Sequence, residues 1–308
     1  MKHFLYFLSL ILLSLTSCKQ DRKESEGLKI GVMSSMDYLP IAIAHEQGFF
    51  DKHQVKVDIQ KFYSANDRDA AFQTGNIDGT VIDYTGAIIQ KAGGVDLKIT
   101  SACNSTFCLM TGSQSGIQQI ADLKGKKIAV SRNTVIDFCV EMALQSVQLS
   151  PADIEKQEIN KIPIRLEMMM KGQSGATALP DPFISIATDK GAQSIVCMED
   201  LGYVVTGIMF KTEVIDNKSA EIEAFYHAYN EAVQYIQTHS IEDIQTILVK
   251  EIGFPEALIH SVKLPTYTLA QLPQNEDIQA VTDWLKGKEL IPADFSTDEI
   301  LESRFTQQ

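Results

Sequence analysis

The feature that most constrains the fold is a regular alternation of strand-like and helix-like segments. The apolar run 28–32 leads through a polar loop into a helix-like stretch with Pro40 in its first turn, and this stretch stops at Gly48. Alternating apolar residues, helix-like stretches and glycine stops then follow one another up to Cys103. Such an alternation of β and α segments predicts a mostly parallel sheet with helices on both faces.

The same order begins again at Lys126 and predicts a second, similar lobe. The run KIAV at 127–130 matches KIGV at 29–32, and 165–172 falls where 68–75 fell, at nearly the same spacing. Identity between the halves is low, so chance regularity of a β/α chain is the alternative to a duplication. We expect an α/β protein with two similar doubly wound lobes.

The chain after residue 200 predicts how the lobes are joined. A strand-like run at 203–210 has no counterpart in the first half, and a long amphipathic helix follows Asn217. We expect the chain to leave the first lobe near 109–111 and to return near 204–207, so that two crossings form a hinge. The predicted lobes are 28–108 with 206–308, and 109–205. A third, all-helical C-terminal domain is the alternative, although no linker-like stretch precedes it.

The first 18 residues predict export. A short basic start, an apolar run at 4–15 and the box ending at Cys18 resemble a bacterial lipoprotein signal, which is cleaved before a cysteine that then receives lipid. The run is about half the ~20 residues that span a bilayer as a helix. We expect a signal peptide at 1–17, a lipidated Cys18, a polar tether at 18–27, and a lipoprotein held at the membrane by that anchor alone, facing the periplasm or the cell exterior. An uncleaved anchor with an ordinary Cys18 thiol is the alternative.

Charge and cysteine usage exclude several function classes. The chain carries 27 Lys and Arg against 40 Asp and Glu, a net charge of −13, which repels nucleic acid and indicates a small-molecule or protein partner. Cys103 and Cys108 could close a small disulfide loop, or all four later cysteines could be buried thiols. Their spacing matches no redox or zinc motif and the histidines are scattered, so we expect no metal and no cofactor.

In open α/β sheets, ligands bind outside the carboxyl ends of the strands, and the polar loops at those ends are the candidate site. Facing sets of such loops would enclose a small solute. The candidate ligand-binding residues are Ser34, Asp37, Tyr38, Asp83, Tyr84, Thr85 and Asn104 in the first lobe, and Ser131, Asn133, Thr134, Asp181 and Phe183 in the second.

Each group of candidates has a structural alternative. The residues at 131–134 are good N-caps for the helix that follows, and the aromatic residues could belong to the core. The aspartates could serve only the helix N-termini, where a carboxylate contributes about 0.3 to 1 kcal/mol. No nucleophile and base stand together in a recognisable motif, and there is no GxSxG or Walker A sequence, so we expect binding without catalysis.

Four segments in this order resemble the substrate-binding proteins of ABC importers, in particular the nitrate, sulfonate, taurine and thiamine-precursor group. They are LKIGVMSSMDYLPIAIAHEQGFFDKHQVKVDI at 28–59, DRDAAFQTGNIDGTVID at 67–83, DLKGKKIAVSRNT at 122–134 and LPDPF at 179–183. The resemblance implies a hinged, type II periplasmic-binding-protein fold that closes on its solute. It also implies an ABC permease and ATPase as partners of a monomeric binding protein.

The loops leave the solute open between two kinds. A sulfonate or nitrate would use the hydroxyl and N–H groups of 131–134, with Arg132, whereas the aspartates and aromatic residues suit a flat, amine-bearing thiamine precursor. Two other functions remain as alternatives. One is an enzyme of thiamine-pyrimidine or menaquinone biosynthesis on the same fold, which would conflict with an exported Cys18, and the other is a lipoprotein that senses a solute.

Overall fold

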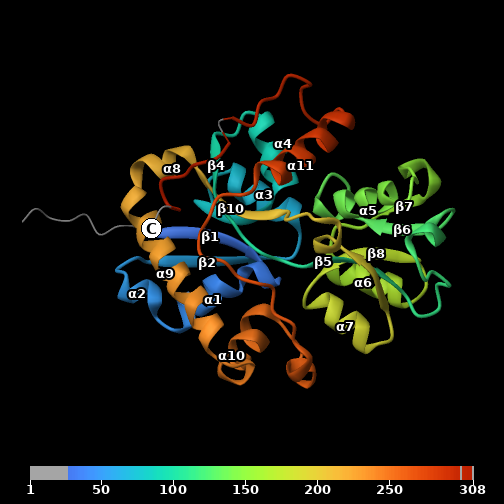
Figure 1. Ribbon diagram of the computed structural model, residues 1–308. Coiled ribbons are helices and arrows are strands. Elements are labelled where there is room, and N and C mark those ends of the chain that lie inside the picture. Colours follow the sequence, from blue (N-terminus) through green and yellow to red (C-terminus); the bar gives the residue numbers. More distant parts are fainter. Residues whose placement is uncertain (1–26, 299, 307–308) are drawn as a thin grey trace, which may run out of the picture.

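The computed structural model describes residues 27–298 and 300–306, which form two lobes, each built on a five-stranded sheet (Figure 1). The first sheet contains β1 (Leu28–Met33), β2 (Val57–Phe62), β3 (Gly79–Asp83), β4 (Leu97–Ala102) and β10 (Thr206–Lys211). The second contains β5 (Phe107–Thr111), β6 (Lys127–Val130), β7 (Glu155–Glu158), β8 (Ala176–Pro180) and β9 (Gln193–Cys197). The predicted pair of α/β lobes is confirmed.

The two sheets have equivalent strand orders. The first runs β2-β1-β3-β10-β4 and the second β7-β6-β8-β5-β9. In each sheet three parallel strands are followed by one strand, β10 or β5, that is antiparallel to both of its neighbours. Each of these antiparallel strands is the first that the chain forms after it crosses between the lobes, so the repeat in the sequence is a repeat of the whole topology.

Helices cover both sheets and the first lobe carries the C-terminal ones (Figure 1). The first lobe has α1 (Leu39–Glu46), α2 (Phe49–Lys52), α3 (Ala65–Gln73) and α4 (Tyr84–Ala92), and the second has α5 (Val135–Ser146), α6 (Ile162–Met170) and α7 (Phe183–Asp189). After β10 come α8 (Thr212–Asn217), α9 (Ser219–Thr238), α10 (Ile241–Ile247) and α11 (Asn275–Gly287). Short 3₁₀ turns lie at Met36–Tyr38, Ile120–Leu123, Pro151–Asp153, Glu199–Leu201 and Glu256–Ser261, and a π-helical turn at Leu248–Ile252.

Polar caps start the helices that follow the carboxyl ends of the strands. The side chains of Ser64, Asp83 and Thr134 accept hydrogen bonds from the first-turn N–H groups of α3, α4 and α5. Each cap satisfies a donor that the helix itself cannot pair, and so fixes where the loop ends. As a result, side chains of these loops are held at the edges of the two sheets.

The alternative of a separate C-terminal domain is wrong. Phe225 and Tyr229 of α9 are fully buried and share one apolar core with Ile30 of β1. Trp284 and Leu285 of α11 belong to a second core that also contains residues of α4. The helical segment therefore has no core of its own and is part of the first lobe.

The last described residues cover the outer edge of β4. The N–H of Ile99 donates to the carbonyl of Ile300 at 2.7 Å, and the N–H of Glu302 donates to the carbonyl of Ile99 at 2.9 Å. Ile99 and Leu301 thereby form a parallel bridge. The N–H and C=O groups of one edge residue are thus paired within the chain.

The first crossing lies earlier in the chain than the sequence predicts. Residues 109–111 are in β5, which pairs with β8 and β9 of the second sheet, so Phe107 and Cys108 also belong to the second lobe. The chain crosses at 103–106 and returns at 198–205, before β10. The sequence indicates a loop at Asn104, but the residues of the apolar run 107–111 that follows do not show which sheet the run joins.

The cysteines follow neither of the two arrangements that the sequence leaves open, a Cys103–Cys108 bond or four buried thiols. Cys108 is bonded to Cys197, and Cys103 is a buried thiol, as is Cys139. Cys108 and Cys197 are directly opposite each other in the antiparallel pair of β5 and β9. Cys103 is the first residue of the crossing and is buried in the core of the other lobe, so closeness in sequence is a poor guide to closeness in space here.

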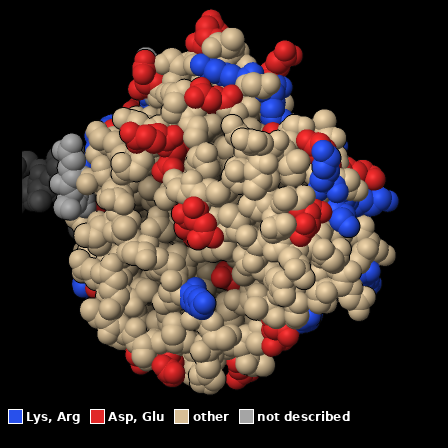
Figure 2. Space-filling view, turned by 45° about the vertical axis from the view of Figure 1, so that its right-hand side comes forward, with Lys and Arg blue, Asp and Glu red and all other residues tan. Residues whose placement is uncertain are grey.

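Several predictions fall outside the described residues. The signal peptide at 1–17, Cys18 and most of the tether at 18–27 lie there. Among the helices that the structure describes, none is long and apolar enough to cross a membrane. On the face that Figure 2 shows, acidic and basic side chains are scattered and do not gather into one basic patch.

Removing the disulfide tests its contribution to the second lobe. The bond closes a loop with a sequence separation of 89 residues. We expect Cys108→Ala combined with Cys197→Ala to lower the free energy of unfolding by about 2–4 kcal/mol, because the unfolded chain regains loop entropy. Urea denaturation measures the change, and a reductant should lower the stability of the wild type but not that of the double variant. Equal effects of the reductant on both proteins would contradict this assignment.

Candidate functional site

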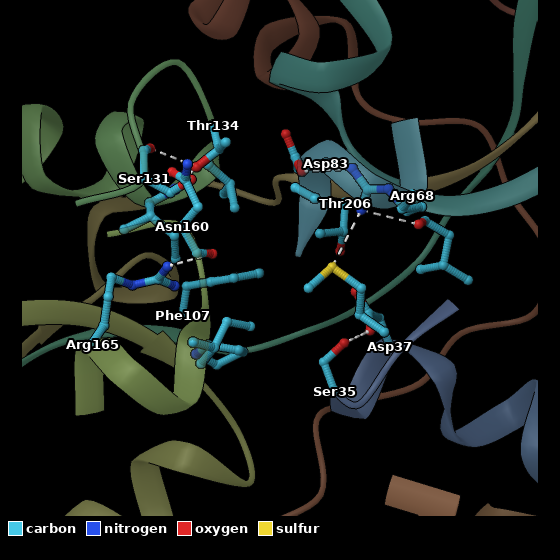
Figure 3. A pocket seen from close by; sticks show the side chains of 17 residues that line it. Ser35, Asp37, Arg68, Asp83, Phe107, Ser131, Thr134, Asn160, Arg165 and Thr206 are labelled. Carbon is cyan, nitrogen blue, oxygen red and sulfur yellow. Dashed lines mark hydrogen bonds and ion pairs between the residues drawn. The ribbon is translucent and has the colours of Figure 1, made fainter. Parts of the chain in front are cut away.

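A cavity lies between the lobes, at the carboxyl ends of strands from both sheets (Figure 3). Its volume is about 50 Å³, several times the roughly 10–15 Å³ that one water needs by the same measure. It therefore has room for a small solute. The lining residues are Met33, Ser35, Asp37, Ala65, Arg68, Val81 and Asp83 of the first lobe, Phe107, Ser131, Thr134, Val135, Ile136, Asn160, Ile162, Arg165 and Pro180 of the second, and Thr206 at the start of β10.

Asp37 is one of two buried carboxyl groups that line the first-lobe side of the cavity, the other being Asp83. It follows β1 in a 3₁₀ turn, where its side chain accepts a hydrogen bond from the hydroxyl of Ser35. Burial raises the pKa of Asp37 to about 6, although the Ser35 bond and the charge of Arg68 act in the opposite direction. Asp37 is thus an acceptor that is ionised at neutral pH and protonated in mild acid.

Arg68 of α3 is a buried cation with two acidic partners. Its guanidinium lies 2.8 Å from Asp69 and 3.3 Å from Asp83 at the closest ion-pair atoms, and it also donates to the carbonyl of Val81 at 3.3 Å. Burial by itself would lower the pKa of Arg68, but the two carboxylates raise it above the ordinary value. The positive charge of Arg68 is therefore already balanced within the first lobe.

Arg165 of α6 is a buried cation without an acidic partner among the described residues. Only 1% of it is exposed, and its guanidinium donates to the carbonyls of Ile159 and Asn160 at 3.0 and 3.2 Å. Its Nε has no hydrogen-bond partner, and burial lowers the pKa of Arg165 to about 10. Since leaving a buried charge unpaired costs several kcal/mol, this group is suited to receive an anion.

Hydroxyl groups add to the second-lobe side. Ser131 donates to the side-chain oxygen of Asn160 at 3.1 Å, and Thr134 donates to the carbonyl of Ser131 at 2.8 Å. Figure 3 shows Arg165 and Asn160 across the cavity from Asp37 and Arg68. The cavity thus has an unbalanced cation on one side and a titratable carboxyl group on the other.

A family model described as NMT1/THI5 like matches residues 35–242, more than half of the chain. The chain belongs to the NMT1/THI5-like family.

Relatives of this family member carry names of two kinds. A protein of Bacillus subtilis (strain 168) named putative aliphatic sulfonates-binding protein is 26% identical over 228 residues, which are 71% of this chain and 68% of the relative. A Haemophilus influenzae protein named putative thiamine biosynthesis protein is 23% identical, with 95% of this chain and 96% of the relative covered.

A solved structure shares the fold. The alkanesulfonate-binding protein SsuA from Xanthomonas axonopodis pv. citri, bound to MOPS, superposes with a TM-score of 0.74 at 20% identity, with 86% of this chain and 94% of that chain covered. The two-lobed fold of this family member is therefore that of a substrate-binding protein.

Four of the twelve candidate residues line the cavity. Asp37 and Asp83 do so from the first lobe, and Ser131 and Thr134 from the second. They come from the loops after β1, β3 and β6, as expected for the carboxyl ends of the strands. Their contact with a ligand stays a prediction.

The other first-lobe candidates do not line the cavity. Tyr38 donates its hydroxyl to Glu251 at 2.8 Å, and Asn104 donates to the carbonyl of Thr266. Thr85 donates to the Asp83 carboxylate, so it supports a lining residue from behind. Tyr84 is buried in the core, and Ser34 is half-buried beside the loop.

The remaining second-lobe candidates lie around the cavity. The N–H of Asn133 donates to Asp137 at 3.2 Å. Asp181 accepts hydrogen bonds from Ser185 and lines an outer hollow between the lobes. Phe183 packs against the second-lobe core, and Arg132 forms an exposed ion pair with Glu158 at 3.0 Å. Asp181, Phe183 and Arg132 thus have structural partners, whereas the exposed side chain of Asn133 lines a different hollow.

The loop-based prediction missed both arginines, although the repeat contained the signal. Arg68 and Arg165 occupy equivalent positions in the two halves. Arg68 lies in helix α3 and Arg165 in helix α6, and their side chains line the cavity although neither residue is in a loop directly after a strand. A search restricted to residues directly after strands therefore could not find them.

Substitution of each arginine by glutamine should show, through the loss of stability, that the charge of Arg68 is paired and that of Arg165 is not. We expect Arg68→Gln to lower the free energy of unfolding by about 3–5 kcal/mol, because it leaves Asp69 and Asp83 without their cation. Arg165→Gln should cost about 1 kcal/mol or less, because removal of an unbalanced buried charge offsets the loss of hydrogen bonds to two carbonyls. Chemical denaturation of both variants gives the comparison, and equal losses of stability would contradict the charge assignment.

Proposed function

We propose that this protein is the solute-binding component of an ABC importer, and that it captures a small solute between its lobes. The solute carries one anionic group, such as a sulfonate or carboxylate, and a hydrogen-bond donor, such as a protonated amine. The single observation that carries this proposal is Arg165, a buried guanidinium with no acidic partner among the described residues, across a cavity from Asp37.

Charge complementarity supports this solute class. An oxyanion at Arg165 would balance the cation with charge-assisted hydrogen bonds, for which a guanidinium is well shaped. Asp37 would accept from an amine on the other end of the solute, and Asp83 disfavours a second negative charge. A solute held by both lobes binds the enclosed arrangement better than a separated one, and this difference is what drives closure.

The names of two similar proteins support solute binding as the role. The Bacillus subtilis relative is named for sulfonate binding, and the Xanthomonas structure is an alkanesulfonate-binding protein. A permease and an ATPase would be the partners, and the binding protein would act as a monomer.

An enzyme of thiamine-pyrimidine or menaquinone biosynthesis is the other function considered, and the name of the Haemophilus influenzae relative motivates it. The residues that line the described cavity include no histidine and no cysteine. The cavity does hold carboxyl and hydroxyl groups, but none of those hydroxyl groups has a histidine of the lining beside it as a general base. Binding without chemistry is the function that the cavity favours.

Isothermal titration calorimetry with three matched probes tests the proposal. We expect 2-aminoethanesulfonate to bind more tightly than ethanesulfonate, and ethylammonium to bind weakly, because only the first engages both Arg165 and Asp37. Arg165→Gln should abolish binding of both sulfonates. If none of the probes nor a wider panel of carboxylates and nitrate binds, or if the protein converts a bound solute into product, the importer proposal fails.

The pH dependence of the same titration is a control. Asp37 is protonated below its pKa of about 6, so an amine-bearing solute should bind about tenfold more weakly at pH 5 than at pH 7. Asp37→Asn should remove this dependence. Ethanesulfonate should bind with little change over the same interval.

We also propose that Cys18 anchors the protein by a lipid after cleavage of 1–17, as the box before it indicates. Several acyl chains on one cysteine hold a protein far more firmly than one myristoyl group. Cys18→Ser should move the protein from the membrane fraction to the soluble fraction without a change in solute affinity. Retention of the Cys18→Ser variant in membranes would contradict the anchor.

A further inference from the structure

The end of helix α11 reaches across to the second lobe. The indole N–H of Trp284 donates to Glu141 of α5 at 2.7 Å. The ammonium of Lys288 lies 2.7 Å from Asp137 and 2.9 Å from Glu141. Because α11 packs on α4 in the first lobe and α5 belongs to the second, these contacts join the two lobes.

The carboxylates at this junction are buried and balanced by two lysines. The side chain of Asp137 is 1% exposed and that of Glu141 is 10% exposed. Lys156 of β7, in the second lobe, contacts both of them. Burial alone would raise the pKa of Asp137, but hydrogen bonds to Lys156 and Lys288 hold it below the ordinary value. The junction is thus a neutral cluster of two acids and two bases.

An aromatic contact lies beside the cluster. Phe138 of α5 packs edge-on against Trp284 at 5.5 Å and against Tyr203 at 5.4 Å between ring centroids. Tyr203 lies in the returning crossing, and the N–H of Val204 in that crossing donates to Asp277 at the start of α11 at 3.1 Å. One end of α11 therefore holds the crossing and the other end holds the second lobe.

The same cluster supports the second-lobe loop of the cavity. Asp137 accepts a hydrogen bond from the N–H of Asn133, a residue with a left-handed φ of 61°. Asn133 stands between Ser131 and Thr134, which line the cavity. Asparagine tolerates this conformation better than most residues, and the hydrogen bond to Asp137 adds to what holds the loop. Lys288 holds that hydrogen bond in place through Asp137.

We propose that Trp284 and Lys288 are positioning residues that latch the second lobe in the arrangement that encloses the cavity. The latch rests on the proposed function, because it would hold the loop at 131–134 and the second lobe in the positions that bind the solute. When the lobes separate, Lys156 stays with Asp137 and Glu141, whereas Trp284 and Lys288 leave them. The two carboxylates then keep a single cation, which makes separation unfavourable.

Substitution of Lys288 by glutamine tests the latch in two ways. Small-angle X-ray scattering of the unliganded protein should show a larger radius of gyration for Lys288→Gln than for wild type. Titration with 2-aminoethanesulfonate should show a dissociation constant about tenfold higher, in the range of a partly buried ion pair. Lys288→Arg, which keeps the charge, should restore both values. Trp284→Phe should have the same direction of effect, since it removes the donor to Glu141 and keeps an aromatic ring.

Lys286→Gln is the matched control, because Lys286 lies in the same helical turn and has no ion pair among the described residues. It should leave both measurements at wild-type values. The latch is wrong if Lys288→Gln changes only the thermal stability, with scattering and affinity unchanged, or if Lys286→Gln has an equal effect. If wild type binds no probe, the proposed function and the positioning role both fail, whereas binding by wild type with no effect of Lys288→Gln overturns the latch alone.

Discussion

The structure depends on two strands that are placed inside sheets directly after the chain has crossed between the lobes. β5 enters the second sheet between β8 and β9, and β10 enters the first between β3 and β4. Both crossings therefore end in inner strands, whose two edges are hydrogen-bonded. The crossings are consequently firmly tied into both sheets, and the carboxyl ends of both sets of parallel strands face one cavity.

The repeat makes the difference between the lobes informative. Arg68 and Arg165 are equivalent, but their surroundings are not. Asp69 and Asp83 balance Arg68, and the equivalent positions in the second half hold Leu166 and Pro180. These two differences between the halves leave the Arg68 guanidinium paired with carboxylates and the Arg165 guanidinium without an acidic partner among the described residues. An unbalanced buried charge is costly to keep, so its presence in a cavity points to a ligand that balances it.

The alternation of apolar and polar residues was enough to predict the two lobes, most strands and the loops at their carboxyl ends. The spacing of apolar residues along a strand or a helix, and the residues that end each element, both follow directly from local backbone geometry. The point of crossing and the pairing of Cys108 with Cys197 depend on which strands meet in space, and no local pattern contains that information. For the site, Asp37 and Ser131 follow strands and were found, whereas Arg165 reaches the cavity from within a helix. The contribution of α11 could not be foreseen either, because Trp284 meets Glu141 only after both lobes have folded.

The short parallel bridge between Ile99 and Leu301 has a consequence for how the protein behaves in a crowded compartment. β4 is the outer strand of its sheet, and an uncovered outer strand offers unpaired N–H and C=O groups to any other chain. Here the end of the same polypeptide occupies those groups at Ile99. Residues 300–302 thereby make Ile99 unavailable for strand pairing with another molecule.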